Sequence, residues 1–87
     1  MRLDKFLKVS RIIKRRTLAK EIADQGRISI NGIPGKASSN VKIGDELLIR
    51  FGQRLMTVEI IDLKETTRKE EASELYRVVK EERVNQE

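Results

Sequence analysis

The sequence predicts an α+β domain, with two short helices at the N-terminus, a small sheet after them and an amphipathic helix near the C-terminus. Three changes in the spacing of apolar residues lead to this prediction. Apolar residues recur every three or four positions up to about residue 25, alternate with polar ones from residue 27 to about residue 63, and return to helical spacing after Lys64. The chain has 87 residues, which is enough for one domain with a small hydrophobic core.

The first helix is predicted near the start of the chain. Leu3, Phe6 and Leu7 follow the i, i+3, i+4 spacing of one buried helix face. The pattern stops near Ser10, so this helix is short.

A second helix is predicted from about Thr17 to Gln25. Thr17 is the expected N-cap, because its hydroxyl can accept a hydrogen bond from the first turn. Leu18 and Ile22 lie four residues apart on one face, and Gly26 suits the left-handed position just after a helix end.

The middle of the chain predicts short strands separated by tight turns. Polar and apolar residues alternate from Arg27 to Ile30, and Asn31-Gly32 is a strong signal for a two-residue hairpin turn. The remaining strands are expected at residues 41–43, 46–51 and 55–63, with turns at residues 33–35, 44–45 and 52–54 between them.

The C-terminal segment predicts an amphipathic helix after a polar hinge. Ala72, Leu75, Tyr76 and Val79 fall at i, i+3, i+4 and i+7. The favoured interpretation is that this stripe covers an exposed face of the sheet. The alternative is that it docks a protein partner. We expect residues 83–87 to be frayed.

Positive charge is concentrated at the N-terminus. Residues 1–27 hold nine Lys or Arg and three Asp or Glu, a net charge of +6, whereas residues 28–87 have a net charge of −1. A basic face on a nearly neutral body indicates a polyanionic partner. A surface that serves only solubility would mix the two signs, and the run Lys14-Arg15-Arg16 does not.

These cations define a candidate phosphate-binding site on the two helices and the loop between them. Several cations on one face bind a polyanion by releasing its counterions. Arginine can make two parallel hydrogen bonds to a phosphate, so the arginines rank above the lysines. Asp4 either orients a neighbouring arginine, which is the favoured interpretation, or accepts a hydrogen bond from a base or a ribose hydroxyl. The candidate residues are Arg2, Asp4, Lys5, Lys8, Arg11, Lys14, Arg15, Arg16 and Lys20.

The composition argues against catalysis and against a bound cofactor or metal. The chain has no His and no Cys, so the usual general base, the thiol nucleophile and the commonest zinc ligands are missing. We therefore expect a protein that is not an enzyme. The longest apolar run, Leu47-Leu48-Ile49, is far too short to span a membrane, and no secretory signal is visible, so a cytoplasmic monomer is expected.

The few aromatic residues do not predict a platform for stacking bases. Phe6, Phe51 and Tyr76 fall in apolar phases of the predicted elements, so core packing is the favoured interpretation for all three. Readers of single-stranded RNA rely on exposed aromatic rings. The chain is therefore expected to recognise the shape and the phosphate backbone of folded RNA.

Five short motifs occur in the order and spacing of a known family. They are Arg2-Leu3-Asp4, Arg16-x-x-Ala19, Gly26, Ile30-Asn31-Gly32 and Val41-Lys42-Ile43-Gly44-Asp45. In this arrangement the chain resembles the RNA-binding domain of small-subunit ribosomal protein four, known as the S-four domain or αL motif. The similarity covers residues 1–51, a little over half of the chain.

The resemblance implies a pair of helices packed on a small, mostly antiparallel sheet, with RNA bound along the helical face. Because the composition changes after Lys64, we expect an RNA-binding domain at residues 1–64, made of the αL motif in residues 1–51 and a following strand, and a C-terminal helical extension at residues 65–87. The chain is most similar to the small stand-alone members, which include the heat-shock protein fifteen group and a short Gram-positive form that acts in ribosome-associated quality control. The implied partners are large-subunit ribosomal RNA, peptidyl-tRNA at the P site of a stalled subunit, and a tRNA-recruiting factor that adds alanine tails to nascent chains.

Two features depart from the family pattern. The residue before the second-helix arginine is often Ser or Thr, and here it is Arg15, which adds charge and removes a potential helix cap. Longer relatives end in an extended basic tail, whereas residues 64–87 hold six cations and seven acids. The tail is therefore not expected to anchor RNA.

Two other functions remain open at the level of the residues. One is a general chaperone of structured RNA or a ribosome assembly factor. The other is a helix-turn-helix DNA-binding protein, which two short basic helices also fit. That module usually has a third helix, and here strands follow the second helix immediately.

Overall fold

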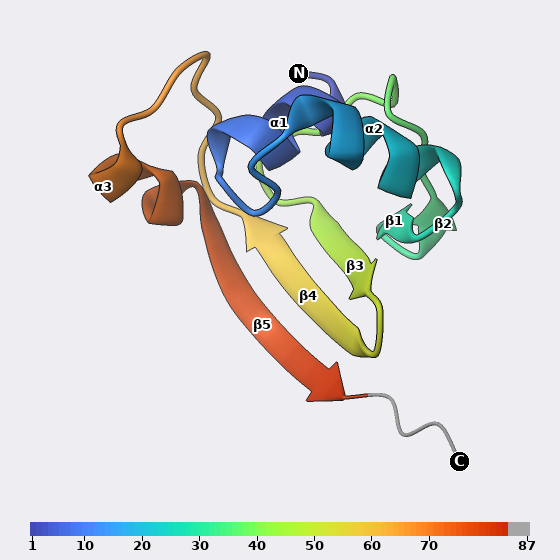
Figure 1. Cartoon of the computed structure of the whole chain (residues 1–87). Helices are drawn as coiled ribbons and strands as arrows, with labels where there is room; N and C mark the ends of the chain where they lie inside the picture. The colour runs from blue at the N-terminus through green and yellow to red at the C-terminus, as the bar shows by residue number, and fades with distance from the viewer. Residues whose placement is uncertain (84–87) are drawn as a thin grey trace.

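The computed structural model describes residues 1–83 and shows two helices on one face of a five-stranded antiparallel sheet (Figure 1). The predicted α+β class is confirmed. A short third helix and a 3₁₀ turn precede the last strand. In chain order the elements are α1 (Leu3–Val9), α2 (Arg16–Asp24), β1 (Ile28–Ile30), β2 (Ile33–Pro34), β3 (Glu46–Phe51), β4 (Arg54–Ile60), α3 (Lys69–Ala72), the 3₁₀ helix η1 (Ser73–Leu75) and β5 (Tyr76–Arg83).

The sheet has the strand order β2-β1-β3-β4-β5, and every neighbouring pair is antiparallel. Helices α1 and α2 lie across one face of it (Figure 1). Along β3 the side chains alternate, because Leu47 and Ile49 are fully buried while Leu48 and Arg50 are exposed. Strand β3 therefore turns Leu48 and Arg50 to the face that α1 and α2 leave open.

The hydrophobic core lies between the two helices and the sheet. Leu3, Phe6 and Leu7 of α1 have no exposed surface, as their spacing predicted. Ile28 of β1 and Leu47 of β3 are fully buried in the same cluster. Burying one side chain of this size stabilises a fold by roughly 1.5–3 kcal/mol, so a core this small depends on each of them.

The turn between β1 and β2 is the one that the sequence predicted. Asn31 and Gly32 both have positive φ, 51° and 84°, as a type I′ hairpin turn requires. The Asn31 side chain also donates to Asp45 at 3.0 Å and accepts the backbone N–H of Glu46 at 2.9 Å. The turn is thereby tied to the start of β3.

Helix α2 begins one residue earlier than expected, and the predicted Thr17 cap is wrong. Arg15 occupies the N-cap position and makes no side-chain cap hydrogen bond, while Thr17 lies inside the helix. The departure from the family pattern at Arg15 therefore does leave α2 without a side-chain cap. At the other end, Gly26 has φ of +77°, the predicted left-handed position just after the helix.

The strand expected at residues 41–43 is not formed. Val41 is buried and its N–H donates to the carbonyl of Met1 at 2.8 Å, while Ile43 is largely exposed. The residues before α1 pair instead with this segment, through an isolated bridge between Arg2 and Asn40. Alternation over three residues was too short to distinguish a strand from a loop that buries one side chain.

The long C-terminal helix is also a wrong prediction. Helical structure ends at Leu75, and Tyr76–Arg83 forms β5, which pairs along the whole of β4. Ala72 and Leu75 are buried as expected, but Val79 is about half exposed on the strand. The apparent four-residue stripe therefore joins two different elements.

Strand β5 extends the main sheet of the protein. The division of the chain at residue 64 remains a prediction, and the predicted fraying falls mainly on residues 84–87, which lie outside the described residues. An ion pair ties β5 to β4, where a hydrogen bond to Glu59 raises the pKa of Arg77; within β5, a hydrogen bond to Glu82 raises the pKa of Lys80. Across residues 1–83, none of the helices is long and apolar enough to cross a membrane.

Candidate nucleic-acid interface

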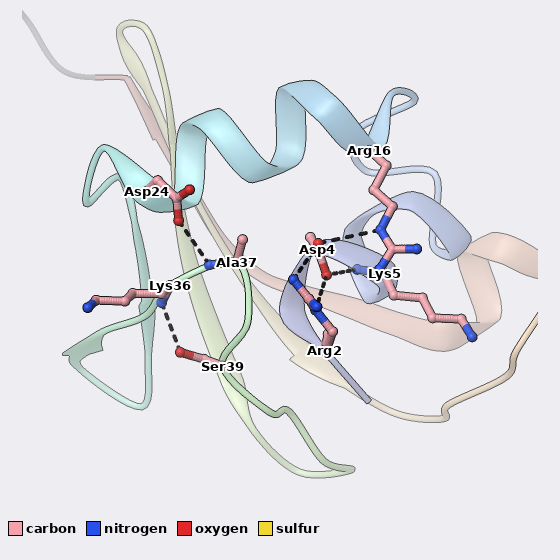
Figure 2. A network of polar contacts seen from close by, with 8 residues as sticks. All are labelled: Arg2, Asp4, Lys5, Arg16, Asp24, Lys36, Ala37 and Ser39. Atoms are coloured by element: carbon pink, nitrogen blue, oxygen red, sulfur yellow. Dashed lines mark hydrogen bonds and ion pairs between the residues drawn. The ribbon is translucent and has the colours of Figure 1, made fainter.

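A buried carboxylate joins the start of α1 to the start of α2. Only 3% of Asp4 is exposed, and its two oxygens accept four hydrogen bonds. Arg2 donates through Nε at 3.2 Å and through Nη2 at 3.3 Å, Arg16 donates through Nε at 3.4 Å, and the backbone N–H of Lys5 donates at 2.8 Å. Figure 2 shows the two guanidinium groups meeting at this one side chain.

This arrangement supports the orienting role predicted for Asp4. Hydrogen bonds to an ionised carboxylate are strong and directional, so they fix the planes of both guanidinium groups. The side chains of Arg2 and Arg16 remain about half exposed, at 49% and 47%. Arg16 contacts Asp4 through Nε alone, so neither of its terminal nitrogens is used in that contact.

The backbone around Asp4 explains why the cluster forms where it does. Leu3 donates its N–H to the carbonyl of Ser39 at 2.7 Å, and Asp4 donates its N–H to the carbonyl of Ala37 at 3.2 Å. The first turn of α1 is thereby held against the loop that follows β2. Burial of Leu3 beside it keeps Asp4 at the inner edge of the helix.

A shallow pocket of about 340 Å³ lies at the other end of α1 and gathers three more of the predicted cations. Arg11 has a positive φ of 59°, an uncommon conformation for this residue type, in the loop that leads from α1 toward α2. The Thr67 hydroxyl donates to the carbonyl of Val9, and this bond holds the segment around Thr67, which follows β4, against the end of α1. The pocket is lined by Lys8, Val9, Arg11, Lys14, Glu65, Thr66 and Thr67.

The remaining candidates are placed on the same two helices. Lys5 forms an ion pair with Glu65, which connects the Asp4 cluster to the pocket. Arg15 precedes α2 and Lys20 lies one turn after Arg16, and both are exposed. Over the part of the chain that the structure describes, no ion pair involves Lys8, Arg11, Lys14, Arg15 or Lys20.

Sequence reasoning missed the contribution of residues 65–67. They follow β4 and lie nearly sixty positions from α1, so no local pattern connects them to it. The only available signal was a polar, threonine-rich stretch in an otherwise charged linker.

The aromatic prediction is confirmed for one ring and needs adjustment for two. Phe6 is fully buried in the core. Phe51 and Tyr76 pack against the core but keep part of their surface exposed. Within residues 1–83, no group of three His, Cys, Asp or Glu side chains is arranged to hold a metal ion.

The site thus presents exposed guanidinium and ammonium groups, and a buried acid holds two of the guanidinium groups. Comparison with known proteins identifies the family to which this chain belongs. The S4 domain matches residues 1–47, more than half of the chain. The chain belongs to the S4 domain family. The S4 match contains α1, α2, β1 and β2, and with them all nine predicted site residues.

Two relatives match this S4 protein over nearly its full length. A "RQC P-site tRNA stabilizing factor" of Bacillus subtilis (strain 168) is 69% identical over 86 residues, which is 99% of this chain and 100% of the relative. A protein of the same name from Streptococcus pneumoniae (strain ATCC BAA-255 / R6) is 54% identical over 86 residues, 99% of this chain and 98% of that one.

A solved structure has the same fold. The structure of Vibrio cholerae Heat Shock Protein 15, described as trimeric, is similar with a TM-score of 0.84 and 35% sequence identity. The similarity covers 91% of this chain and 81% of that one. It therefore extends beyond the S4 match into the strands that follow.

Proposed function

We propose that this S4 protein is a non-catalytic RNA-binding factor of ribosome-associated quality control, which acts in the cytoplasm. It binds ribosomal RNA and peptidyl-tRNA on stalled large ribosomal subunits and supports alanine tailing of the nascent chain, together with a tRNA-recruiting elongation factor. Support comes from the full-length identity to relatives named as P-site tRNA stabilizing factors.

The observation that carries the RNA-binding part is the pair of arginines held by Asp4. Arg2 lies immediately before α1 and Arg16 is the first residue of α2, both within the S4 match, and their guanidinium groups are oriented before any ligand arrives. A side chain that is already ordered loses less conformational entropy on binding. The surrounding lysines and arginines add the charge that releases counterions from RNA.

The non-catalytic part of the proposal follows from the chemistry of the site. Its side chains are guanidinium and ammonium groups and one buried acid whose two oxygens accept four hydrogen bonds. Such groups can hold and position phosphates, but none of them is placed as a general base beside a nucleophile.

Co-sedimentation with large subunits that carry peptidyl-tRNA tests this function. We expect the wild-type chain to sediment with these particles and the Arg2→Ala/Arg16→Ala variant to remain in the supernatant. A matched control is Arg68→Ala/Arg77→Ala, which removes the same charge from two exposed arginines outside the S4 match. Circular dichroism shows whether each variant is folded. Equal sedimentation of both variants would show that the site is wrongly assigned.

Two comparisons of ligands, made with the wild-type chain, separate the alternative functions. A general RNA chaperone or assembly factor would bind subunits equally well with and without peptidyl-tRNA. A DNA-binding protein would prefer duplex DNA to an RNA stem-loop at the same salt concentration. The proposed function requires the opposite result in both comparisons. The monomeric state expected from the sequence stays a prediction, to be checked by sedimentation equilibrium.

A further inference from the structure

Arg27, just before β1, and Arg50 of β3 are neighbours at the end of the sheet next to the turn that follows α2. The backbone N–H of Arg50 donates to the carbonyl of Arg27 at 3.0 Å, next to the cross-strand pair of Ile28 and Ile49. Arg27 and Arg50 are therefore direct neighbours across two strands. Like charges in this position destabilise a sheet, so the pair has an energetic cost in the absence of a counterion.

Both side chains belong to the face of the sheet opposite the helices. Ile28 and Ile49 are fully buried toward α1 and α2. Because side chains alternate along extended chain, the residues next to them, Arg27 and Arg50, project to the other side, and both are exposed. The nine candidate residues of the S4 site all lie on the helical side instead.

Within the described part of the chain, no acidic side chain forms an ion pair with either Arg27 or Arg50. Two arginines farther along the sheet do have acidic partners: Arg54 of β4 pairs with Glu81 at 2.6 Å, and Arg77 of β5 pairs with Glu59 at 2.5 Å. The pair of Arg27 and Arg50 thus lacks the acidic partner that Arg54 and Arg77 each have.

The two arginines line a polar groove of about 500 Å³ that is open to solvent. Its other walls come from the turn after α2 and from the turn between β3 and β4. Glycines in both turns leave the backbone bare, and two glutamine side chains provide amide donors. The lining residues are Gln25, Gly26, Arg27, Arg50, Gly52 and Gln53.

We propose that Arg27 and Arg50 form a second binding site for the RNA phosphate backbone, on the opposite side of the molecule from Arg2 and Arg16. The inference rests on the proposed function, because it takes RNA as the partner. With one site on each side, a single chain can bridge two separate RNA segments. A factor that holds a tRNA on ribosomal RNA needs such a bridge.

The chemistry of the groove favours a polyanion over a single phosphate ion. Two exposed arginines attract one small anion only weakly, because solvent screens the interaction. A nucleic-acid backbone brings several phosphates and gains from counterion release. Guanidinium groups and amides also match phosphate oxygens geometrically, with no need for an aromatic surface.

The test is a count of RNA molecules bound by each chain. Two stem-loop RNAs of different length are mixed with the protein at low salt, and the complexes are sized by sedimentation velocity. We expect the wild-type chain to form a complex of one protein with two RNAs. Arg27→Gln/Arg50→Gln should bind only one RNA, so the salt-dependent binding of a second RNA should be lost. Arg2→Ala/Arg16→Ala should bind one RNA through the remaining site.

The matched control is Arg77→Gln/Lys80→Gln, which removes the same charge from β5, and we expect it to retain two RNAs. The inference is overturned if Arg27→Gln/Arg50→Gln, shown to be folded by circular dichroism, binds RNA with the same stoichiometry and affinity as this control. It is also overturned if inorganic phosphate competes with the second RNA at micromolar concentration, because the groove would then be a small-anion site.

Failure of the proposed function gives a different pattern. In that case co-sedimentation with ribosomal particles is insensitive to Arg2 and Arg16, while the two-RNA complex formed with isolated stem-loops still depends on Arg27 and Arg50. Failure of this inference alone leaves co-sedimentation dependent on Arg2 and Arg16 and removes any effect of Arg27 and Arg50 beyond the control.

Discussion

At the scale of single residues, the functional side chains depend on one acid that is almost entirely inaccessible. Asp4 is 3% exposed, and it accepts hydrogen bonds from Arg2, Arg16 and the Lys5 backbone. A buried carboxylate is tolerated only where hydrogen bonds replace the water that it loses. Here the same bonds also position the cations that are proposed to meet RNA.

Replacing Asp4 by Asn tests this dependence. Asp4→Asn keeps the size of the side chain but removes its charge and one acceptor oxygen. We expect a loss of roughly 1–2 kcal/mol in the free energy of unfolding, because hydrogen bonds to charged groups are strong but the arginines are half exposed. RNA affinity should fall roughly ten-fold as two side chains lose their fixed orientation.

Urea unfolding and a binding titration with an RNA stem-loop measure the two effects. Asp24→Asn is the matched control, since it changes the charge equally at an exposed acid near the end of α2. An Asp4→Asn variant that binds RNA as tightly as the Asp24→Asn variant would contradict an orienting role.

The sequence could predict which cations are candidates, but not how they are held. Arg2 and Arg16 were identified from charge and from the family motifs. The bond from Arg16 to Asp4 joins residues 12 positions apart in different helices, and only the packing of α1 against α2 creates that contact. The pair at Arg27 and Arg50 was missed for the same reason, because strand pairing brings together residues that look unrelated along the chain.

At the scale of elements, helix α2 begins without the usual polar cap. Arg15 stands at the N-cap and provides no side-chain hydrogen bond to the first turn. The position contributes positive charge near a helix N-terminus, which is unfavourable for the helix dipole but favourable for binding an anion. At this position α2 therefore has a positive charge in place of a stabilising side-chain cap.

A cap can be restored by Arg15→Ser. We expect this variant to gain roughly 0.5–1 kcal/mol in the free energy of unfolding relative to Arg15→Ala, because the serine oxygen can accept a backbone N–H. Thermal unfolding followed by circular dichroism compares the two variants. They remove the same charge, so a difference in stability reports the cap alone. Equal melting temperatures would mean that α2 does not need one.

Strand β5 shows where periodicity in the sequence is ambiguous. Ala72 and Leu75 end a helical segment, and the next residues alternate across a strand, yet the four apolar positions also fit one helical stripe. The decisive factor is the edge of β4, whose backbone groups pair with β5 along seven residues from Arg54 to Ile60. A short window of sequence carries no information about that partner.

Leu75 is expected to anchor β5. Its side chain is fully buried, and its carbonyl accepts the N–H groups of Ile61 at 2.8 Å and Asp62 at 3.2 Å. Leu75→Ala should cost roughly 2–5 kcal/mol, because it leaves a cavity in a small core. Val79→Ala, on the exposed strand, should cost less than about 0.5 kcal/mol. Chemical unfolding of both variants decides this, and a loss below about 1 kcal/mol at Leu75 would rule out the anchor.

At the scale of the whole molecule, the segregated charge predicted from the sequence is set out on two helices and their connecting loop. Residues 1–27 carry a net charge of +6, and the structure places eight of their nine cations around α1 and α2, while Arg27 lies just before β1 beside Arg50. If about six phosphates are neutralised, the logarithm of affinity should fall against the logarithm of salt concentration with a slope of about −4 to −5.

A titration of one RNA stem-loop over a range of potassium chloride concentrations measures this slope. Arg2→Ala/Arg16→Ala should make it less steep by about two, since two phosphate contacts are lost. A slope near zero for the wild-type chain would be incompatible with an electrostatic interface.

The fold class followed from sequence at this scale because it depends on repeated patterns, helical spacing first and alternation afterwards. The strand order could not be predicted from the sequence, because it depends on which strand edges remain unpaired after the short strands have paired. β3 was predicted with its observed bounds, whereas β5 was predicted as a helix. In a chain of this size, the elements that can be predicted are the regular segments in which apolar residues keep one constant spacing.

The shared carboxylate has a consequence for how substitutions combine. Because Arg2 and Arg16 both donate to Oδ2 of Asp4, removal of either one lets the other rearrange around this carboxylate. The two losses should therefore not add, and a double-mutant cycle should give a non-zero coupling energy. The three positions should therefore evolve together, because a substitution at one of them changes the effect of a substitution at the other two.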